Sequence, residues 1–230
     1  MGLPEWILLG LLGAILFLDA WPVAQTMLSR PIVAGALTGI VLGAPADGVF
    51  WGAVFEAVYL GVLPVGAARY PDAGLAALVG TALAARAEGA EPTVYLVAAA
   101  LSAGALGDWT SGLQRRWNGR TAAGVRARVA AGDLKAPGRA IGAAVSRGAL
   151  IGAAAAVGSV ALALAGLELV RGTLWAGPAS RESLRLAALA AVVVSGGRLF
   201  LERRSERLAW LAGLVVAGGV AAWSAGGFAP

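Results

Sequence analysis

Apolar runs occupy most of this 230-residue chain and constrain its fold more than any other feature. Hydrophobic residues make up 59% of the sequence and charged residues only 13%, about half the charged share of an ordinary soluble protein. Several runs approach the roughly 20 apolar residues that an α-helix needs to cross a bilayer. We therefore expect an all-α, polytopic integral membrane protein with about six to eight membrane segments, folded as one domain over residues 1–230. Residues 1–20 lack the basic start and the small-residue cleavage pattern of a secretory signal, so we expect them to form the first membrane segment.

Three consecutive apolar runs in the first half of the chain are short for membrane-spanning helices. Glycine and proline separate these runs, which cover Ile32–Gly43, Gly48–Leu63 and Ala73–Ala85. Short, interrupted apolar segments are typical of broken or re-entrant helices around the midplane site of a transporter. Ordinary buried helices joined by tight turns are the alternative interpretation. Gly35, Gly39 and Gly43 recur at every fourth position, a spacing that predicts close helix packing.

Positive charge gathers in one segment, 108–147, where only Asp108 and Asp133 oppose it. The basic residues of this segment are Arg115, Arg116, Arg120, Arg126, Arg128, Lys135, Arg139 and Arg147. Cytoplasmic loops of membrane proteins carry such an excess, and the Ala, Arg and Leu content favours helix. We expect 108–147 to be a cytoplasmic loop or amphipathic helix. It divides a substrate-site half at 1–107 from C-terminal spans at 148–230, which we expect to end outside the cytoplasm.

The composition excludes several classes of functional site. The chain contains neither cysteine nor histidine, which rules out disulfides, thiolate catalysis, Cys/His metal sites and a phosphohistidine carrier. Neither a nucleophile–base pair nor a phosphate-binding loop is visible, so we expect no enzymatic activity from the chain by itself, and no cofactor. The net charge of +5 does not indicate nucleic acid, because no basic face is interleaved with exposed aromatic residues.

Charged residues between apolar segments point to a transport site. The stretch Val65–Ala73 combines charge with glycine and proline, a helix-breaking motif that is costly at bilayer depth unless it lines a cavity. Glu56 is the only charged residue between Asp47 and Arg69. Its carboxylate could accept hydrogen bonds from two adjacent substrate hydroxyls. An ion pair with Arg69 or Arg30 is the alternative.

Three further residues carry more than one interpretation. Asp72 follows Pro71, so it could cap a helix, contact a substrate, or do both. Asp19 ends the first apolar run, where helix capping or interfacial placement competes with substrate contact. Trp51 lies five residues before Glu56 and is expected either to pack in the core or to stack on a sugar ring.

Sequence blocks within residues 15–85 resemble, in order and spacing, those of one family. The blocks are Ser29–Gly43, Gly52–Gly61, Pro64–Ala73 and Leu75–Leu83. Together they look like the enzyme IIC component, the membrane permease subunit, of mannose/sorbose-type sugar phosphotransferase systems (PTS). By matching position, the resemblance implies that Glu56 and Asp72 contact the sugar and that Asp19 occupies an acidic position of the family. The candidate sugar-site residues are Asp19, Trp51, Glu56, Gly66, Ala67, Ala68, Arg69 and Asp72, with the three residues at 66–68 shaping a loop.

The resemblance also implies partners and a location. A IIC component works with a second membrane subunit, IID, as a homotrimer of heterodimers in the lipid of the bacterial inner membrane, and the two subunits share the sugar cavity. The sugar is released to the cytoplasm and phosphorylated there by a IIB protein, which a IIA protein supplies. The absence of histidine agrees with this division of labour.

Two other functions remain open at this point. An ion-coupled carrier would use Asp19, Glu56 and Asp72 as proton or sodium sites. A non-transporting assembly or sensory subunit would keep the fold without moving a substrate. The ion-coupled carrier requires an ion gradient for uptake, and the assembly subunit predicts that Glu56→Gln leaves the phenotype unchanged.

Overall fold

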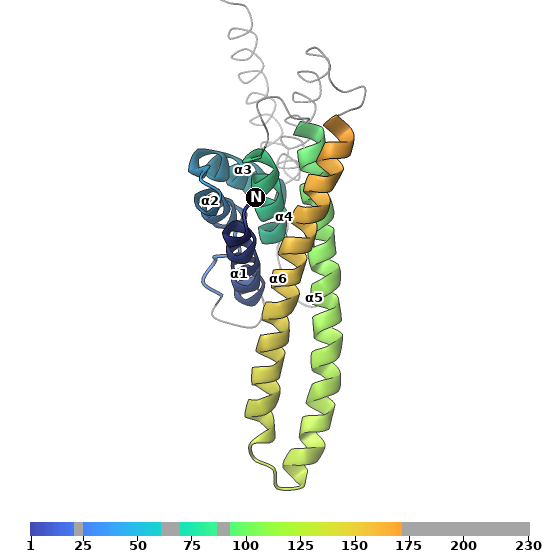
Figure 1. Cartoon of the computed structure of the whole chain (residues 1–230). Coiled ribbons are helices and arrows are strands. Elements are labelled where there is room, and N and C mark those ends of the chain that lie inside the picture. Colours follow the sequence, from blue (N-terminus) through green and yellow to red (C-terminus); the bar gives the residue numbers. More distant parts are fainter. Residues whose placement is uncertain (21–24, 61–69, 87–92, 172–230) are drawn as a thin grey trace, which may run out of the picture.

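The computed structural model describes residues 1–20, 25–60, 70–86 and 93–171, and in these ranges the chain is all-α (Figure 1). The helices are α1 (Leu3–Ala20), α2 (Pro31–Val41), α3 (Pro45–Tyr59), α4 (Ala73–Ala84), α5 (Thr93–Ala130) and α6 (Ala136–Arg171). By length and composition, α1 and the Ala136–Leu169 part of α6 are long and apolar enough to cross a membrane. The expected short segments are short helices: 11 residues in α2 and 12 in α4, or about 17 Å and 18 Å against a hydrocarbon core of about 30 Å.

Helices α2 and α3 form a tight hairpin because glycine ends one and proline begins the other. Gly43 follows the C-cap of α2 with φ of 73°, a left-handed conformation that glycine adopts without steric cost. Pro45 then occupies the first turn of α3, where its missing N–H would have no partner in any case. Gly35 and Gly39 bring the two helices together, as their spacing predicted, whereas Gly43 makes the turn and has no neighbour within 4 Å of its Cβ position.

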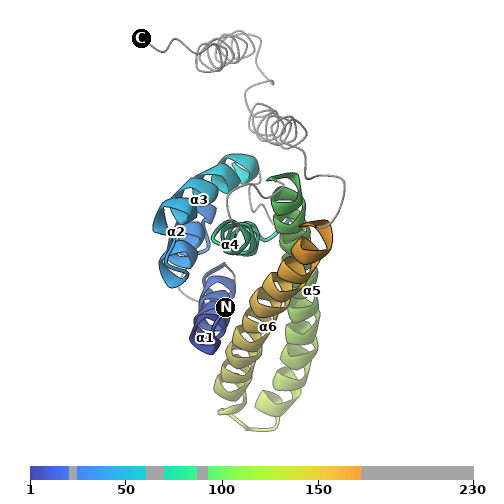
Figure 2. The same cartoon turned by 45° about the horizontal axis from the view of Figure 1, so that its top comes forward.

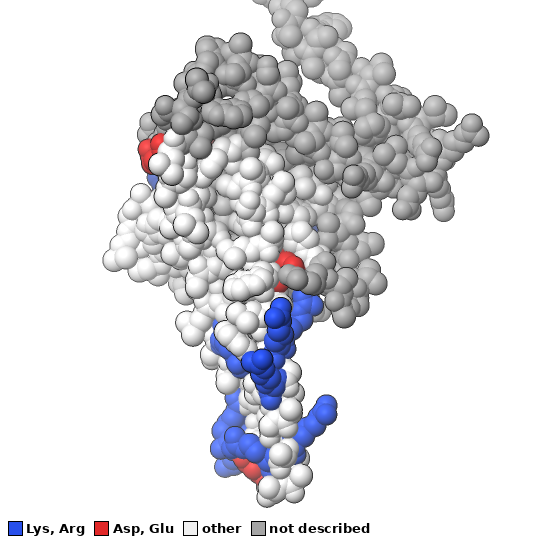
Figure 3. All heavy atoms as spheres, turned by 90° about the vertical axis from the view of Figure 1, so that its right-hand side faces the viewer, with Lys and Arg blue, Asp and Glu red and all other residues white. Residues whose placement is uncertain are grey.

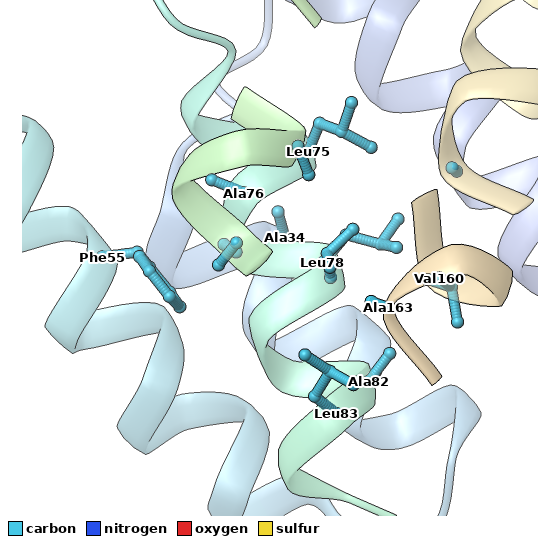
Figure 4. Packing of buried hydrophobic residues seen from close by; sticks show 14 of the residues in the cluster. Ala34, Phe55, Leu75, Ala76, Leu78, Ala82, Leu83, Val160 and Ala163 are labelled. Carbon is cyan, nitrogen blue, oxygen red and sulfur yellow. The ribbon is translucent and has the colours of Figure 1, made fainter. Parts of the chain in front are cut away.

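Helix α4 is the centre of the bundle and packs against all five other helices (Figure 2). Every residue from Gly74 to Leu83 is buried. A helix that is apolar on all sides belongs in a core, and the sequence AGLAALVGTALA is of that kind. Side chains from α2, α3 and α6 close around it, including Ala34, Phe55 and Val160 (Figure 4).

Small residues also bring α1 against α6. A Cβ added at Gly13 would lie 2.7 Å from the carbonyl oxygen of Gly152, so only glycine permits this backbone approach. In the first turn of α1, Glu5 forms an ion pair with Arg86, which follows α4. The first contact therefore joins α1 to α6, and the second joins α1 to the end of α4.

Helix α5 is 38 residues long and continues without a break from apolar residues into the basic segment 108–147. Helix α6 begins within the same segment, so the segment is helical on both sides of a turn. The two helices project from the bundle as a long hairpin, and lysine and arginine side chains gather along it (Figures 1 and 3). Gly132, with φ of 91°, makes the turn at the tip. Asp133 joins the two helices there: it accepts hydrogen bonds from Arg128 at 2.8 Å and from Arg139 at 2.5 Å.

The glycine contact between α2 and α3 generates a stability prediction. A Cβ at Gly39 would lie 2.6 Å from the carbonyl oxygen of Ala44 and 2.8 Å from the Cα of Gly48, both of them backbone atoms that cannot rotate away. Gly39→Ala is therefore expected to separate the helices and to lower the melting temperature of the purified protein by at least about 2 °C. Gly124→Ala on α5 is the control, since nothing lies within 4 Å of its Cβ position and alanine favours helix. Equal melting temperatures for the two variants would contradict the packing described here.

The turn of the basic hairpin generates a pH prediction. Burial alone would raise the pKa of the Asp133 carboxyl, but the hydrogen bond from Arg128 and the charges of Arg139 and Arg128 outweigh it and lower the pKa. A carboxyl whose pKa is lowered on folding stabilises the folded form while it is ionised. This contribution is present above the ordinary aspartate pKa of about 4, and it is lost as the pH falls through the lowered value.

Spin labels on the hairpin would measure this effect, since the chain has no cysteine of its own. With labels at Ala127→Cys and Ala143→Cys, two exposed positions, we expect a narrow distance distribution at pH 7 that broadens at pH 3. Asp133→Asn should give the broad distribution already at pH 7. A distribution that stays narrow in the variant would show that Asp133 does not hold the turn.

Candidate functional site

A cavity of about 580 Å³ lies where the ends of several helices meet. The size falls in the range of small-molecule sites in proteins. The described residues that line it are Asp19, Ala20, Gln25, Met27, Ser29, Arg30, Pro31, Glu56, Tyr59, Tyr70, Pro71, Asp72, Ala73, Gly74 and Ser111. The cavity thus receives the end of α1, the loop before α2, the last turns of α3, the start of α4 and one residue of α5.

The structure brings together the three acidic residues that the sequence singled out, Asp19, Glu56 and Asp72. Each of their carboxylates accepts a hydrogen bond from a backbone N–H at or near the start of a helix. Such N–H groups have no partner inside their own helix. The acids therefore stabilise the interrupted backbone around the cavity as well as giving the cavity its polar character.

Glu56 lies on α3 and joins it to the start of α2. One carboxylate oxygen forms an ion pair with Arg30, one of the two alternatives that the sequence left open. The other oxygen accepts a hydrogen bond from the backbone N–H of Ile32 at 3.3 Å. The Glu56 side chain is 18% exposed and that of Arg30 is 53% exposed, so a ligand in the cavity can reach the pair.

Asp72 is the N-cap of α4, as its position after Pro71 suggested. Its carboxylate accepts a hydrogen bond from the backbone N–H of Leu75 at 2.9 Å, and its own N–H donates to the carbonyl oxygen of Gly104 at 2.9 Å. A Cβ at Gly107 would lie 3.1 Å from an oxygen of the Asp72 carboxylate. Glycine on α5 is therefore needed for Asp72 to sit where it does, and the cap anchors the cavity to α5.

Asp19 is 5% exposed and organises the loop before α2. One of its oxygens accepts hydrogen bonds from the backbone N–H and the hydroxyl of Thr26, both at 2.6 Å, and the other accepts one from the N–H of Ser29 at 2.9 Å. Within this loop Gln25 and Met27 adopt φ of 50° and 67°, which is costly for residues other than glycine. The hydrogen bonds to Asp19 hold a strained loop in place, and residues of this loop line the cavity. Asp19 therefore helps to shape the cavity wall through that loop.

The other candidates are arranged differently. Trp51 is not among the described residues that line the cavity; its ring packs 6.1 Å from that of Phe55 and 5.4 Å from that of Phe50. This is the core packing that was one of its two interpretations. Gly66, Ala67, Ala68 and Arg69 lie outside the described residues.

Several lining residues were not singled out as site residues from the sequence. Tyr59 was detectable, since it lies three residues after Glu56 and shares its helix face. Arg30 was considered only as an ion-pair partner of Glu56. Nothing in the sequence around Ser111 marks it, because its position depends on how α5 packs against α4. Among the described residues no group of three or more metal-ligating side chains is close enough to hold a metal ion.

Comparisons with known proteins identify the family of this chain. The sequence model of one family, described as the PTS system sorbose-specific IIC component, matches residues 3–181. A putative N-acetylgalactosamine permease IIC component 2 of Escherichia coli K12 is 37% identical over 76 residues, which cover 33% of this chain and 56% of that protein. The mannose-specific EIIC component of the same strain is 44% identical over 54 residues, 24% of this chain and 20% of its own length. The chain thus spans about half, or less, of the curated relatives that it matches.

Solved structures share the fold. A chain described as a membrane protein superimposes with a TM-score of 0.73 at 21% identity, over 95% of this chain and 87% of the other. A chain of the mannose transporter ManYZ, solved in complex with microcin E492, gives a TM-score of 0.61 at 23% identity with the same coverage. The expectation of an all-α integral membrane protein is confirmed. Because the family match extends over most of the sequence, the chain belongs to the sorbose-specific IIC family of the phosphotransferase system.

Proposed function

We propose that this chain is the sugar-translocating subunit of a mannose/sorbose-type phosphotransferase system in a bacterial inner membrane. The observation that carries the proposal is the convergence of Asp19, Glu56 and Asp72 on one cavity in a protein of the IIC family. Relatives of the chain are named as N-acetylgalactosamine, sorbose and mannose components, which supports a hexose or a related sugar as the substrate.

The polar groups of the cavity suit an uncharged, hydroxylated molecule. Glu56 only accepts hydrogen bonds and Arg30 only donates them, and the two lie in contact. Adjacent hydroxyls of one sugar could bond to both at once, each hydroxyl donating to the carboxylate or accepting from the guanidinium. The charges of Glu56 and Arg30 neutralise each other, and the carboxylates of Asp19 and Asp72 accept hydrogen bonds from backbone N–H groups. Asp72 completes the proposed sugar contacts, together with the residues at 66–69.

The proposal assigns the remaining steps to other subunits. The cavity would be shared with a IID subunit, and a trimer of such heterodimers would deliver the sugar to a IIB protein for phosphorylation, with IIA upstream. The basic hairpin of α5 and α6 would face the cytoplasm, in line with the positive-inside rule, and the C-terminus would lie on the other side. The chain itself would move the sugar and carry out no phosphoryl transfer.

Sugar uptake tests the proposal directly. The chain would be expressed with its IID, IIB and IIA partners, and radiolabelled mannose, sorbose, fructose and N-acetylgalactosamine would be supplied with and without the phosphorylated histidine of IIB. We expect phosphorylated sugar to accumulate only when that histidine is present. Uptake that ignores the histidine but stops with an uncoupler would identify an ion-coupled carrier. A stable complex without any uptake would identify an assembly or sensory subunit.

Glu56→Gln is the first informative variant. Glutamine can still accept the hydrogen bond from the Ile32 N–H, but it loses the ion pair with Arg30 and the charge offered to the sugar. We expect the KM for uptake to rise at least about tenfold, because a hydrogen bond to a charged group is worth about 1.5–3 kcal/mol. Glu5→Gln breaks a second ion pair, with Arg86, that does not line the cavity, and it should leave the KM unchanged. If both variants change the KM equally, Glu56 does not contribute specifically to sugar binding.

Asp19→Asn tests the role of the strained loop. Asparagine replaces one of the two accepting oxygens with an NH2 group, which donates hydrogen bonds. This group would face the N–H of Thr26 or of Ser29, which is also a donor. We expect faster hydrogen exchange at the Thr26 or Ser29 amide and a KM about tenfold higher, since an unsatisfied buried donor costs about 1–3 kcal/mol. Asp47→Asn, at an exposed position away from the cavity, is the control. Unchanged exchange at both amides in Asp19→Asn would rule out this role.

A further inference from the structure

Among the serine and threonine side chains that the structure describes on α5, Ser111 differs from the other three. Ser102, Thr110 and Thr121 each donate to a carbonyl oxygen one turn earlier in the helix, at 2.8, 2.9 and 3.0 Å. This back-bonding is the ordinary way for a helix to satisfy a serine or threonine in apolar surroundings. The hydroxyl of Ser111 is buried and makes no hydrogen bond.

The burial of Ser111 makes that exception costly. The residue is 2% exposed, and a buried hydroxyl without a partner loses the hydrogen bonds that it made in water. Among the described side chains, the hydroxyls of Thr81 and Ser159 are also buried without a partner. Neither of these residues lines the cavity, whereas Ser111 does. Among the residues that the structure describes, Ser111 alone combines a buried, unpaired hydroxyl with a place in the cavity wall.

The packing of α5 explains why Ser111 lies at the cavity. Gly104, Gly107 and Ser111 are spaced by three and four residues and so share one helix face. A Cβ at Gly104 would lie 2.7 Å from the Tyr59 hydroxyl oxygen, and one at Gly107 would meet the Asp72 side chain. The two glycines let α5 approach the corner of the cavity formed by Tyr59 and Asp72. Ser111, one turn further along, is the one described residue of α5 or α6 that lines the cavity.

The chemistry of a serine hydroxyl complements the groups already in the cavity. Glu56 accepts and Arg30 donates, whereas a hydroxyl does both. A sugar hydroxyl also does both, so it can donate to Ser111 and accept from it. We propose that the Ser111 hydroxyl hydrogen-bonds a hydroxyl of the transported sugar and thereby selects substrates that carry that hydroxyl. This inference rests on the proposed function and adds to it a specificity-determining residue from the second half of the chain.

Hydroxyl deletion on both partners tests the inference. The intact complex would be assayed with whichever of mannose, sorbose, fructose and N-acetylgalactosamine the unmodified chain transports, and with the monodeoxy analogues of that sugar. We expect Ser111→Ala to raise the KM for the parent sugar about threefold to tenfold, the usual range for one neutral hydrogen bond, with the maximal rate unchanged. For the monodeoxy analogue that lacks the hydroxyl bonded by Ser111, the variant and the unmodified chain should have the same KM. This loss of discrimination is not expected from a structural role.

Ser159→Ala is the matched control. It also removes a buried, unpaired hydroxyl, but from α6 and away from the cavity, so it should leave the KM for every analogue unchanged. If Ser111→Ala raises all KM values by the same factor, or none of them, while the unmodified chain transports sugar, the inference fails and the proposed function stands. If the unmodified chain transports no sugar in the presence of its partners, both fail. Complex formation by each variant, measured by size-exclusion chromatography, verifies that the variants fold.

Discussion

Backbone N–H groups at the breaks between short helices are the constraint on which this structure depends. Every helix start exposes N–H groups that the helix itself cannot satisfy, and a bilayer supplies no water to replace the missing partners. In this protein Asp72 satisfies one such group at the start of α4, Glu56 satisfies one at the start of α2, and Asp19 satisfies two in the loop before it. The carboxylates therefore have a structural reason to lie at these helix breaks before any ligand is considered.

The same arrangement explains where the cavity forms. Glycine contacts bring α2 against α3 and α1 against α6 at backbone distance, and α4 is buried from Gly74 to Leu83, so little space remains between the helices. Space opens where helices stop and start, and there the polar groups gather. The residues that support the structure at this point are also the ones proposed to contact the substrate. Substitutions of these acids must therefore be read with a measure of folding beside the measure of uptake.

Local patterns predicted much of the first half of the chain. Glycine and proline marked the short helices, and proline before Asp72 offered a cap as one interpretation of that residue. The isolated charge of Glu56 suggested an ion pair with Arg69 or Arg30, and the structure shows one with Arg30. Other features depend on packing that no local pattern encodes. The segment 108–147 was expected as a loop or an amphipathic helix. In the structure it contains the end of α5, a turn and the start of α6, and both helices extend beyond it into apolar runs.

Two features of the cavity were hidden from the sequence for physical reasons. Gln25 and Met27 adopt positive φ in a loop that Asp19 holds through hydrogen bonds to residues seven and ten positions later in the chain. Neither Gln nor Met is a residue type from which such a conformation is predicted. Ser111 resembles any serine in a helix. Ser111 lines the cavity only because α5 approaches Tyr59 and Asp72 through Gly104 and Gly107.

The length of α5 has a mechanical consequence. The helix contains 38 residues and is about 57 Å long, and Ser111 lies near its midpoint. A helix without a break behaves as a rod, so a tilt of about 10° around that midpoint would displace the basic tip by about 5 Å. Any tilt of α5 beside the cavity would therefore also move the basic tip of the hairpin, because both belong to one continuous helix.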